Sequence, residues 1–392
     1  MADEVLERGR RRVDWIRSRM SLLAEVRNAF SVSQPFRGLK IGVSLHVEPK
    51  TVVLFETLLA GGAEMVITGN FGTTQDDMVA VLRAQGMTAY GARNDTWDQH
   101  LGNVARVVES NPDILLDNGA DLAAIAARTG RVGRIRGGTE ETTSGGDRLR
   151  DELAGQVPFP VIVINDSPIK QIAENQHAVG EGTVESFMRI TNLMVNGRRF
   201  VVVGYGWCGR GIAHYLRSFG AHVAVVEVDP IKAMEAALAG FRVGTLEALA
   251  PWAQAVVTAT AREGVVGLAA LARMSSGTIL ANAGHFPTEI DVAALRATST
   301  KVVAMTDEIE RFEFSDGRHL ILLTGGRMFT LAGREPKGNS IESMDVGFTL
   351  QSLSLERVAT AAKSLTPGAQ PVPADINREL ARRIVAMLSP PS

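Results

Sequence analysis

The sequence predicts an α/β protein built from two domains, with the second domain inserted into the first. Three observations lead to this prediction. Short apolar runs alternate with amphipathic stretches of helical periodicity, which is typical of βαβ units and a parallel sheet. The alternation occurs in two series that are separated by a long helical stretch. The chain has 392 residues, enough for two or three domains of about 100–200 residues each.

The first series follows an amphipathic helix at the N-terminus. In that helix Val13, Ile16, Met20 and Leu23 recur at spacings of three and four, which places them on one face. The arginine cluster at 8–12 is expected to form a solvated face. The pattern then predicts, in order, a strand at 39–46, a helix at 51–63, a strand at 63–70, a helix at 76–87 and a strand at 113–121 that runs into a polar loop.

The second series begins with a strand at 157–166 and a long helix around 180–196. It continues with a strand at 198–206, a helix to about 218, and strands at 222–229, 257–261, 277–284 and 319–324. A last helix starts near residue 374. We therefore expect a first domain over 1–181, an inserted domain over 182–345, and a return of 346–392 to the first domain.

Composition excludes several classes of function. The 41 Lys and Arg residues nearly balance 43 Asp and Glu, so the net charge of −2 favours neither nucleic acid nor an anionic membrane as a partner. No apolar run approaches the roughly 20 residues that cross a bilayer, and no secretory signal is expected. The single cysteine, Cys208, excludes an internal disulfide framework and points to a reducing cytoplasm. Without an HExxH or a cluster of His and Asp, no metal site is expected.

A glycine motif, GYGWCG, carries the strongest chemical signal. Gly204, Gly206 and Gly209 form a GxGxxG between a β-branched strand at 199–203 and a helix at 212–219. In this setting the glycines allow a tight turn, a close approach of the backbone to a pyrophosphate, and close packing of helix on strand. The helix N-terminus adds partial positive charge. The motif therefore predicts a dinucleotide-binding Rossmann domain, and a glycine-rich turn without a ligand is the alternative.

An acidic residue at the end of the next strand indicates which dinucleotide is bound. Glu227 lies 18 residues after Gly209. A carboxylate at this place accepts hydrogen bonds from ribose hydroxyls and repels a 2′-phosphate, so NAD is expected rather than NADP. Cys208, inside the glycine turn, is interpreted as a small packing residue rather than a nucleophile.

Several segments resemble the S-adenosylhomocysteine hydrolase (adenosylhomocysteinase) family. They run in the family's order over nearly the whole chain and read SLHVEPKTVVLFETLLAGGAE (44–64), NFGTTQD (70–76), GGTEETTSGGDRL (137–149), INDSPIKQIAEN (164–175), GYGWCGRG (204–211), EVDPIKAMEAALAGFRV (227–243) and NAGHFPTEID (282–291). The resemblance implies a substrate-binding domain that encloses an NAD-binding one.

The resemblance also implies a mechanism. In this family, tightly held NAD oxidises the 3′-hydroxyl of a nucleoside ribose. The ketone acidifies the C4′ proton, a base removes that proton, and the 5′ substituent leaves by elimination. Water then adds and the ketone is reduced, so NAD is regenerated in each turnover.

Site residues follow from the resemblance position by position. The catalytic group it implies is His46, Asn118, Glu141, Lys170, Glu174, Asn175 and His285. The cofactor-binding group is Thr142, Thr143, Asn175, Gly204, Gly206, Trp207, Cys208, Gly209, Glu227, Thr260, Ala283, Gly284, His285 and Thr330. The substrate-binding group is His46, Glu48, Lys50, Thr74, Asn118, Glu141, Lys170, Glu174 and Asn339. Lys170 suits the role of base, and the two histidines suit proton transfer.

The chain departs from the family pattern mainly on the substrate side. Asn118 replaces a catalytic aspartate and cannot act as a carboxylate base. Glu48 and Lys50 replace the threonine and the glutamate or glutamine that read the adenine side. The remaining departures are Glu174 for an aspartate, Val179 for a cysteine, Thr330 for an asparagine, and Gly338-Asn339-Ser340 for a GHP motif. Such changes favour an altered substrate over a dead enzyme.

Three hypotheses of function follow. The leading one is 5′-dehydration of an adenine nucleoside in nucleoside-antibiotic biosynthesis, with Glu48 protonating a leaving hydroxide. The alternative is a conventional S-adenosylhomocysteine hydrolase that releases adenosine and homocysteine. The lesser alternative is a non-catalytic NAD-binding regulator. A homo-oligomer is expected, and because the family's Lys/Tyr tail is missing after Ser392, a dimer and a looser tetramer are both open.

Overall fold

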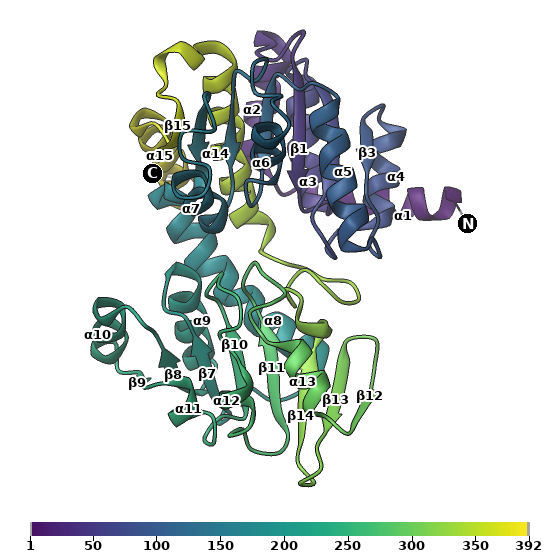
Figure 1. Cartoon of the computed structure of the whole chain (residues 1–392). Coiled ribbons are helices and arrows are strands. Elements are labelled where there is room, and N and C mark those ends of the chain that lie inside the picture. The colour runs from purple at the N-terminus through teal and green to yellow at the C-terminus, as the bar shows by residue number, and fades with distance from the viewer. Residues whose placement is uncertain (1, 390–392) are drawn as a thin grey trace. The chain divides into compact units, whose positions relative to one another are not determined.

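Residues 2–389 are described by the computed structural model, and they form two compact units. The first unit comprises Met1–Gln171 and Ile341–Ser392, and the second comprises Ile172–Ser340. The sequence analysis placed the corresponding borders after residues 181 and 345. The predicted fold class, α/β with one domain inserted into another, is confirmed (Figure 1).

The first unit is built on a seven-stranded parallel sheet in the order β15-β6-β5-β4-β1-β2-β3. Its strands are β1 (Lys40–Leu45), β2 (Glu64–Gly69), β3 (Thr88–Tyr90), β4 (Ile114–Asp117), β5 (Gly137–Glu140), β6 (Pro160–Val163) and β15 (Gly368–Pro371). Because all seven run in the same direction, their carboxyl ends lie at one edge of the sheet. In open parallel sheets this edge is where ligands bind.

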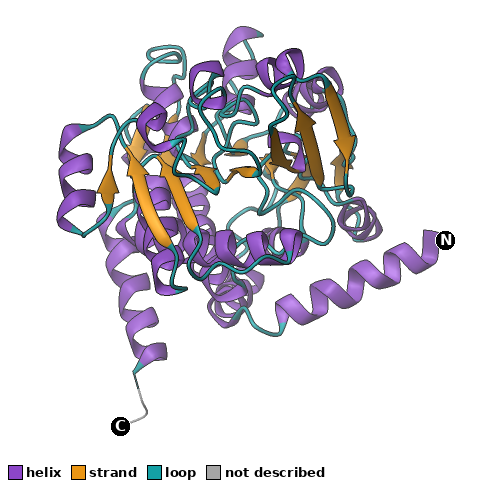
Figure 2. Cartoon of the chain, turned by 90° about the horizontal axis from the view of Figure 1, so that it is seen from below, coloured by secondary structure: helices purple, strands orange, loops and turns teal. Residues whose placement is uncertain are grey.

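Helices cover both faces of this sheet, and Figure 2 shows the strands of the chain flanked by helices. One core packs the sheet against α1 (Ala2–Arg17), α2 (Ser21–Ser33), α3 (Pro49–Ala60), α4 (Asp76–Ala84), α14 (Ile341–Ala361) and α15 (Ala374–Leu388). The other core packs it against α5 (Trp97–Glu109), α6 (Asp121–Arg128) and α7 (Thr143–Arg150). The continuous apolar strands of the sequence are therefore buried on both faces, as parallel sheets require.

The second unit contains an eight-stranded sheet in the order β12-β13-β14-β11-β10-β7-β8-β9. Six strands are parallel: β7 (Arg199–Val203), β8 (His222–Val226), β9 (Arg242–Val243), β10 (Ala255–Thr258), β11 (Thr278–Asn282) and β14 (His319–Leu323). Taken in chain order they give the arrangement 3-2-1-4-5-6 of a dinucleotide-binding Rossmann fold. The strand order reverses between β7 and β10, so a dinucleotide is expected to cross the sheet edge there.

The helices of the second unit lie in two layers with separate cores. One core includes residues of α8 (Val179–Thr191), α9 (Trp207–Ser218) and α10 (Pro230–Leu238). The other includes residues of α11 (Leu246–Leu249), α12 (Leu268–Leu271) and α13 (Val292–Thr298). Six of the described strands were not predicted from the sequence: the parallel strands β3, β5, β9 and β15, and the antiparallel pair β12 (Lys301–Ala304) and β13 (Ile309–Glu313), which extends this sheet. The side chains of β12 and β13 are half-buried or exposed apart from Phe312, and β13 carries three charged residues, so neither strand reads as a buried apolar run.

One expectation about the N-terminal region was wrong, and a second held for three of four arginines. The apolar stripe from Val13 to Leu23 spans two helices, because α1 ends at Arg17 and α2 begins at Ser21. The arginine cluster is only partly solvated, since the Arg12 guanidinium lies 2.7 Å from the buried Asp77 carboxylate and 2.6 Å from Gln75. These contacts fix α1 on α4.

A π-helix precedes the long helix that the sequence predicted around 180–196. It spans Lys170–Ala178 and is followed directly by α8. In an α-helix, residues five apart point about 140° away from each other. The i→i+5 hydrogen bonding of a π-helix instead brings such residues to the same side. Lys170 and Asn175 are five residues apart, so this winding changes which side chains share a face.

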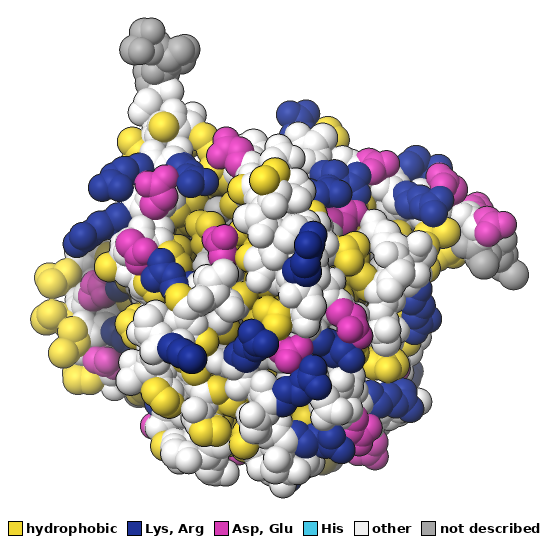
Figure 3. Space-filling model, turned by 90° about the horizontal axis from the view of Figure 1, so that it is seen from above, with side chains coloured by type: hydrophobic (Ala, Val, Ile, Leu, Met, Phe, Trp, Pro, Cys, Tyr) yellow, Lys and Arg dark blue, Asp and Glu magenta, His cyan; other side chains and the backbone are white. Residues whose placement is uncertain are grey.

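The surface carries charges of both signs. On the face drawn in Figure 3, basic and acidic side chains are interspersed rather than separated into patches. Among the described helices, none has both the length and the apolar character that a membrane-spanning segment needs.

Candidate functional site

Polar side chains gather where the strands of the first unit end. His46, Glu48 and Lys50 follow β1, Asn70, Thr73 and Thr74 follow β2, Asn118 follows β4, and Glu141 follows β5. These strands are neighbours in the sheet, so their loops meet at one edge. The structure therefore brings together most of the substrate-side residues that the resemblance implied.

His46 is oriented by a threonine of the neighbouring loop. Its Nδ1 lies 2.8 Å from the Thr73 hydroxyl, which itself donates to the Asn70 carbonyl oxygen at 3.2 Å. A hydroxyl has one proton to donate, so Thr73 accepts from the Nδ1–H of His46. This network favours the tautomer in which Nε2 carries the lone pair, the form suited to accept a proton.

Glu48 and Lys50 form a buried ion pair at the start of α3. The Lys50 Nζ lies 2.9 Å from Glu48 Oε2, and each residue is only 5% exposed. Pro49 occupies the first turn, and the Thr51 hydroxyl accepts from the Glu48 backbone N–H at 3.0 Å. The helix start thus holds a carboxylate and an ammonium side by side in a low-dielectric setting.

Asn118 is held by a second amide side chain. The Asn70 Nδ2 donates to Asn118 Oδ1 at 2.7 Å, and both residues are buried. With its oxygen occupied in this way, Asn118 presents its amide nitrogen as a hydrogen-bond donor. The loop position where the family has a carboxylate therefore offers a donor instead of a base.

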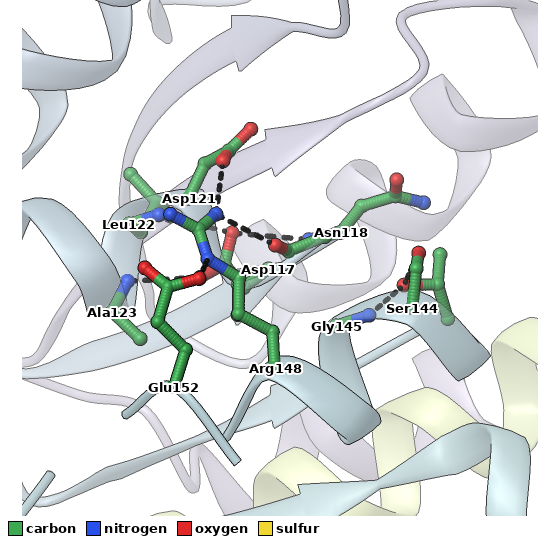
Figure 4. A network of polar contacts seen from close by, with 12 residues as sticks. Asp117, Asn118, Asp121, Leu122, Ala123, Ser144, Gly145, Arg148 and Glu152 are labelled. Atoms are coloured by element: carbon green, nitrogen blue, oxygen red, sulfur yellow. Dashed lines mark hydrogen bonds and ion pairs between the residues drawn. The ribbon is translucent and has the colours of Figure 1, made fainter. Parts of the chain in front are cut away.

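Two buried carboxylates fix the loop that carries Asn118. Glu140 accepts from the backbone N–H groups of Gly119, at 3.0 Å, and Ala120, at 2.9 Å. It also accepts from the N–H and hydroxyl of Thr142, at 2.7 and 2.6 Å. Asp117 accepts from the N–H groups of Leu122 and Ala123 at the start of α6, as Figure 4 shows. Burial raises the pKa of both acids, and for Asp117 the nearby Glu140 adds to the increase.

Arg148 closes the same loop from α7. Its guanidinium bonds the Asp121 carboxylate at 2.8 Å and the Gly119 carbonyl oxygen at 3.2 Å (Figure 4). Burial opposes ionisation of Asp121, but hydrogen bonding to His100 and the charge of Arg148 hold its pKa below the usual range. The backbone around Asn118 is therefore fixed without using the Asn118 side chain.

Lys170 reaches the same group of side chains from the start of the π-helix. Its Nζ lies 3.1 Å from Glu141 Oε1, and both side chains are less than a tenth exposed. A buried ammonium beside a carboxylate can exchange a proton with it and with a bound hydroxyl. This pair joins the start of the π-helix to the loop that follows β5.

The glycine turn of the second unit fits a dinucleotide. Gly204 has a φ of +98°, and a Cβ there would lie 2.8 Å from the Ala259 carbonyl oxygen. A Cβ on Gly209 would lie 2.0 Å from the Gly204 carbonyl oxygen, so α9 packs against the turn only with glycine. At Gly206, which is the N-cap of α9 and provides no side-chain cap, a Cβ would meet nothing within 4 Å. The turn is thus open on the side where a pyrophosphate approaches a helix N-terminus.

Glu227 lies at the end of β8, where the fold places the adenosine ribose. Its carboxylate accepts from the backbone N–H groups of Tyr205 at 2.7 Å, Val228 at 2.7 Å and Asp229 at 2.9 Å. A carboxylate has about four acceptor positions, so capacity remains for a ribose hydroxyl. The same bonds tie the glycine turn to the ribose position.

The remaining predicted site residues, for cofactor and substrate, are divided between the two units. Thr260 follows β10, Ala283, Gly284 and His285 follow β11, and Thr330 lies just beyond β14. Glu174, Asn175 and Asn339 also belong to the second unit, where Asn339 Nδ2 donates to Glu174 Oε1 at 3.3 Å. Thr142 and Thr143 belong to the first unit, where they bond Glu140, Gly145 and Asn165 at the start of α7.

Comparison with known proteins agrees with this geometry. The family model described as "S-adenosyl-L-homocysteine hydrolase" matches residues 3–132, and the model of its NAD binding domain matches residues 175–335. An S-inosyl-L-homocysteine hydrolase of Methanopyrus kandleri is 41% identical over 95% of this chain and 89% of its own length. An adenosylhomocysteinase of Sulfolobus acidocaldarius is 37% identical over 96% and 91%.

The chain belongs to the S-adenosylhomocysteine hydrolase family. The match to the family's NAD-binding domain and the fit of the glycine turn make NAD the cofactor of this S-adenosylhomocysteine hydrolase relative. We infer that the turn from Gly204 to Gly209 would hold the pyrophosphate of NAD and that Glu227 would hold its ribose.

Several residues that hold the loops and side chains of the candidate site in place were given no role from the sequence. Asn70 and Thr73 lie in the NFGTTQD segment, Glu140 in EETT, and Glu289 in the segment that ends EID. All four were quoted within motifs, but no role was assigned to them. Their signal was their place beside a site residue, and only the fold shows which atoms they bind.

Proposed function

We propose that this chain hydrolyses S-inosyl-L-homocysteine to inosine and homocysteine. The observation that carries the proposal is the buried Glu48–Lys50 ion pair, at the two positions which in the family read the purine base. Hypoxanthine has a donor at N1–H and an acceptor at O6, whereas adenine has an acceptor at N1 and a donor at N6. A carboxylate beside an ammonium complements hypoxanthine and opposes adenine.

The names of the relatives support the same substrate. S-inosyl-L-homocysteine hydrolase is the name of four matching archaeal proteins, among them that of Methanothermobacter thermautotrophicus, 39% identical over 95% of this chain and 90% of its own length. Matching proteins named adenosylhomocysteinase support the conventional hydrolase reading in the same way.

The residues of this chain can be given roles in that reaction. NAD, when bound, supplies the oxidation of the ribose 3′-hydroxyl and its later reversal. Lys170, having passed a proton to Glu141 3.1 Å away, takes up the proton of that hydroxyl. His46, with its lone pair on Nε2, accepts the C4′ proton and delivers it to the leaving sulfur. It then accepts a proton from the attacking water and returns it to C4′.

The amide at Asn118 bears on the choice of leaving group. Dehydration, the first hypothesis from the sequence, needs a strong acid to expel hydroxide, whose conjugate acid has a pKa of about 15.7. A thiolate leaves far more easily, because a thiol has a pKa of about 8.5. Asn118 cannot donate a proton as an acid, and Glu48 is held in its ion pair with Lys50. Hydrolysis of a thioether therefore suits these side chains better than dehydration.

The test is a comparison of substrates and a swap of the ion pair. The purified holoenzyme is expected to cleave S-inosyl-L-homocysteine at least about 100-fold more efficiently than S-adenosyl-L-homocysteine, measured as kcat/KM from thiol release. The double variant Glu48→Thr, Lys50→Gln, which restores the family's residue types, is expected to reverse this preference.

A second ion pair of the same unit provides the control. Lys40 and Glu64 lie 3.0 Å apart on β1 and β2, and Lys40→Gln with Glu64→Thr should leave the preference unchanged. A wild-type preference for the adenosyl substrate would refute the base assignment. Loss of water from an adenine nucleoside, seen by mass spectrometry without thiol release, would instead establish dehydration.

A further inference from the structure

The loops that follow β10 and β11 share one buried acid. In this strand order a bound dinucleotide extends from the β8 side, where Glu227 lies, to the ends of β10 and β11. The nicotinamide end is therefore expected beside the loops at 259–261 and 283–286. Glu289, on the segment that leads to α13, is fully buried and lies between these loops.

Glu289 collects three hydrogen bonds from the first loop. It accepts from the Thr260 backbone N–H at 3.0 Å, the Thr260 hydroxyl at 2.8 Å and the Ala261 backbone N–H at 2.9 Å. Ala261 has a φ of +50°, a conformation that a residue with a Cβ adopts at a cost of about 1 kcal/mol or more. The carboxylate holds the loop in this unfavourable backbone shape.

The second loop meets the same carboxylate by close packing. A Cβ built on Gly284 would lie 1.8 Å from Glu289 Oε1, so only glycine allows this approach. The neighbouring Asn282 completes the arrangement, because its Oδ1 accepts from the Gly284 N–H at 2.8 Å and from the Thr258 hydroxyl at 2.9 Å. Its Nδ2 donates to the Phe286 carbonyl oxygen at 2.8 Å. The backbone beside His285 is thus fixed from both sides.

We propose that Glu289 is a positioning residue for NAD, which holds the loops at 259–261 and 283–286 in the shape that receives the nicotinamide end. It does so through backbone groups, without taking part in the chemistry. A loop that is ordered before binding loses little entropy when the cofactor binds, so this carboxylate slows NAD release. The proposal concerns the cofactor and is independent of which nucleoside is the substrate.

Ionised Glu289 is the form that these contacts select. All three donors of the first loop point at an acceptor, and a neutral amide in its place would turn an NH₂ group toward at least one of them. Burial raises the pKa of Glu289 above its ordinary value, and the bonds from Thr260 and Ala261 limit that increase. Replacing the acid by its amide therefore removes the restraint with little change in volume.

The test uses the holoenzyme and the variant Glu289→Gln. Exchange of bound NAD for isotope-labelled NAD is expected to become about tenfold faster or more, which corresponds to about 1.4 kcal/mol. The fluorescence of bound NADH should shift toward that of free NADH, because the nicotinamide is held less firmly. The melting temperature of each variant, measured in parallel, shows whether the fold is retained.

A matched control lies in the same loop. Glu263 is exposed and bonds the Thr288 hydroxyl at 3.1 Å, so Glu263→Gln should leave exchange and fluorescence unchanged. Equal effects of Glu263→Gln and Glu289→Gln, or wild-type exchange and fluorescence in Glu289→Gln, would overturn the proposal.

A second variant reaches the carboxylate from the other side. Gly284→Ala should also speed exchange, because the new methyl group displaces the Glu289 side chain. If both variants act through this contact, the double variant exchanges little faster than the faster single variant. If the two increases in exchange rate instead multiply in the double variant, Gly284 acts through a contact other than Glu289. That result would contradict the shared restraint. If Glu289→Gln does not fold, Gly284→Ala alone decides, and unchanged exchange then refutes the proposal.

Discussion

Both units use a buried glutamate to organise a loop at the edge of the sheet. Glu140 accepts four hydrogen bonds from Gly119, Ala120 and Thr142, and Glu289 accepts three from Thr260 and Ala261. Each also lies against a glycine, Gly145 or Gly284, whose Cβ would collide with it. Ionised acids that bind backbone N–H groups hold them more strongly than neutral acceptors do.

Lys170 offers the most direct test of the substrate-side chemistry. Lys170→Gln is expected to lower kcat by about 10²–10⁴-fold, because the base beside the ribose is lost. NAD content should not change, since the glycine turn and Glu227 lie elsewhere in the chain. Both are measured on the same preparation, kcat from thiol release and NAD by its absorbance after denaturation.

The surface lysine Lys40 provides the comparison for this variant. Lys40→Gln removes an equal charge on β1 at a partly exposed position and should retain full activity. Activity near the wild-type level in Lys170→Gln would remove Lys170 from the mechanism.

The sequence nominates candidate site residues, but their hydrogen-bond partners could not be predicted from it. His46, Lys170 and Glu227 are recognisable because they stand in motifs at fixed spacing. Thr73, which orients His46, is 27 residues distant, and the hydrogen bond depends on β1 and β2 being neighbours. Pairing between strands is set by the whole sheet, and no local pattern carries it.

At the scale of elements, one acid determines where α2 starts. Asp345, on α14, accepts from the backbone N–H groups of Leu22 at 3.0 Å and Leu23 at 2.8 Å. These donors have no partner within their own helix, because the first turn of a helix lacks acceptors. This long-range cap explains why the predicted single helix is divided after Arg17.

The pH dependence of stability should report this cap. Burial raises the pKa of Asp345 to about 6, above its ordinary value of 3.8. The folded state then binds more protons than the unfolded state between about pH 4 and pH 6. The free energy of unfolding should therefore fall as pH rises through this window, by at most about 1.4 kcal/mol per pH unit.

The variant Asp345→Asn isolates this contribution. It should remove the decrease between about pH 4 and pH 6, measured by urea unfolding together with hydrogen exchange at the amides of Leu22 and Leu23. A decrease of the same size in wild type and variant would assign the titration to another group.

The order of helices and strands followed from periodicity, and the exceptions have physical causes. The parallel strands β1, β2, β7 and β11 were predicted because they are buried on both faces and read as apolar runs. The parallel strands β3, β5, β9 and β15 were not predicted, because each is short and carries no run of large apolar residues. The pair β12–β13 was not predicted because its residues are largely half-buried or exposed and β13 carries three charges. The π-helix at 170–178 leaves no apolar periodicity that distinguishes it from an α-helix.

At the scale of the molecule, the two units have separate hydrophobic cores. A ligand that binds only the folded state stabilises it, by about 2.7 kcal/mol at 100 times its Kd. Removal of NAD should therefore speed hydrogen exchange mainly in Ile172–Ser340, and less in the sheet of the first unit. Mass spectrometry of exchanged peptides with and without NAD measures this, and equal changes in both units would show that their stabilities are coupled.

The expected homo-oligomer stays a prediction, for which light scattering of the holoenzyme is the measurement.

The division of the first unit into two stretches of chain has a consequence for biosynthesis. Its core includes residues of α14 and α15, and its sheet is completed by β15, all from the last 52 residues of the chain, Ile341–Ser392. Domains fold as units while the ribosome adds about 5–20 residues each second. The inserted unit is therefore synthesised before α14, and β4 and β5 wait for this covering helix until Ile341–Ala361 has been made. During that interval the part of the sheet that α14 covers is exposed, and it is then that the nascent chain most needs a chaperone.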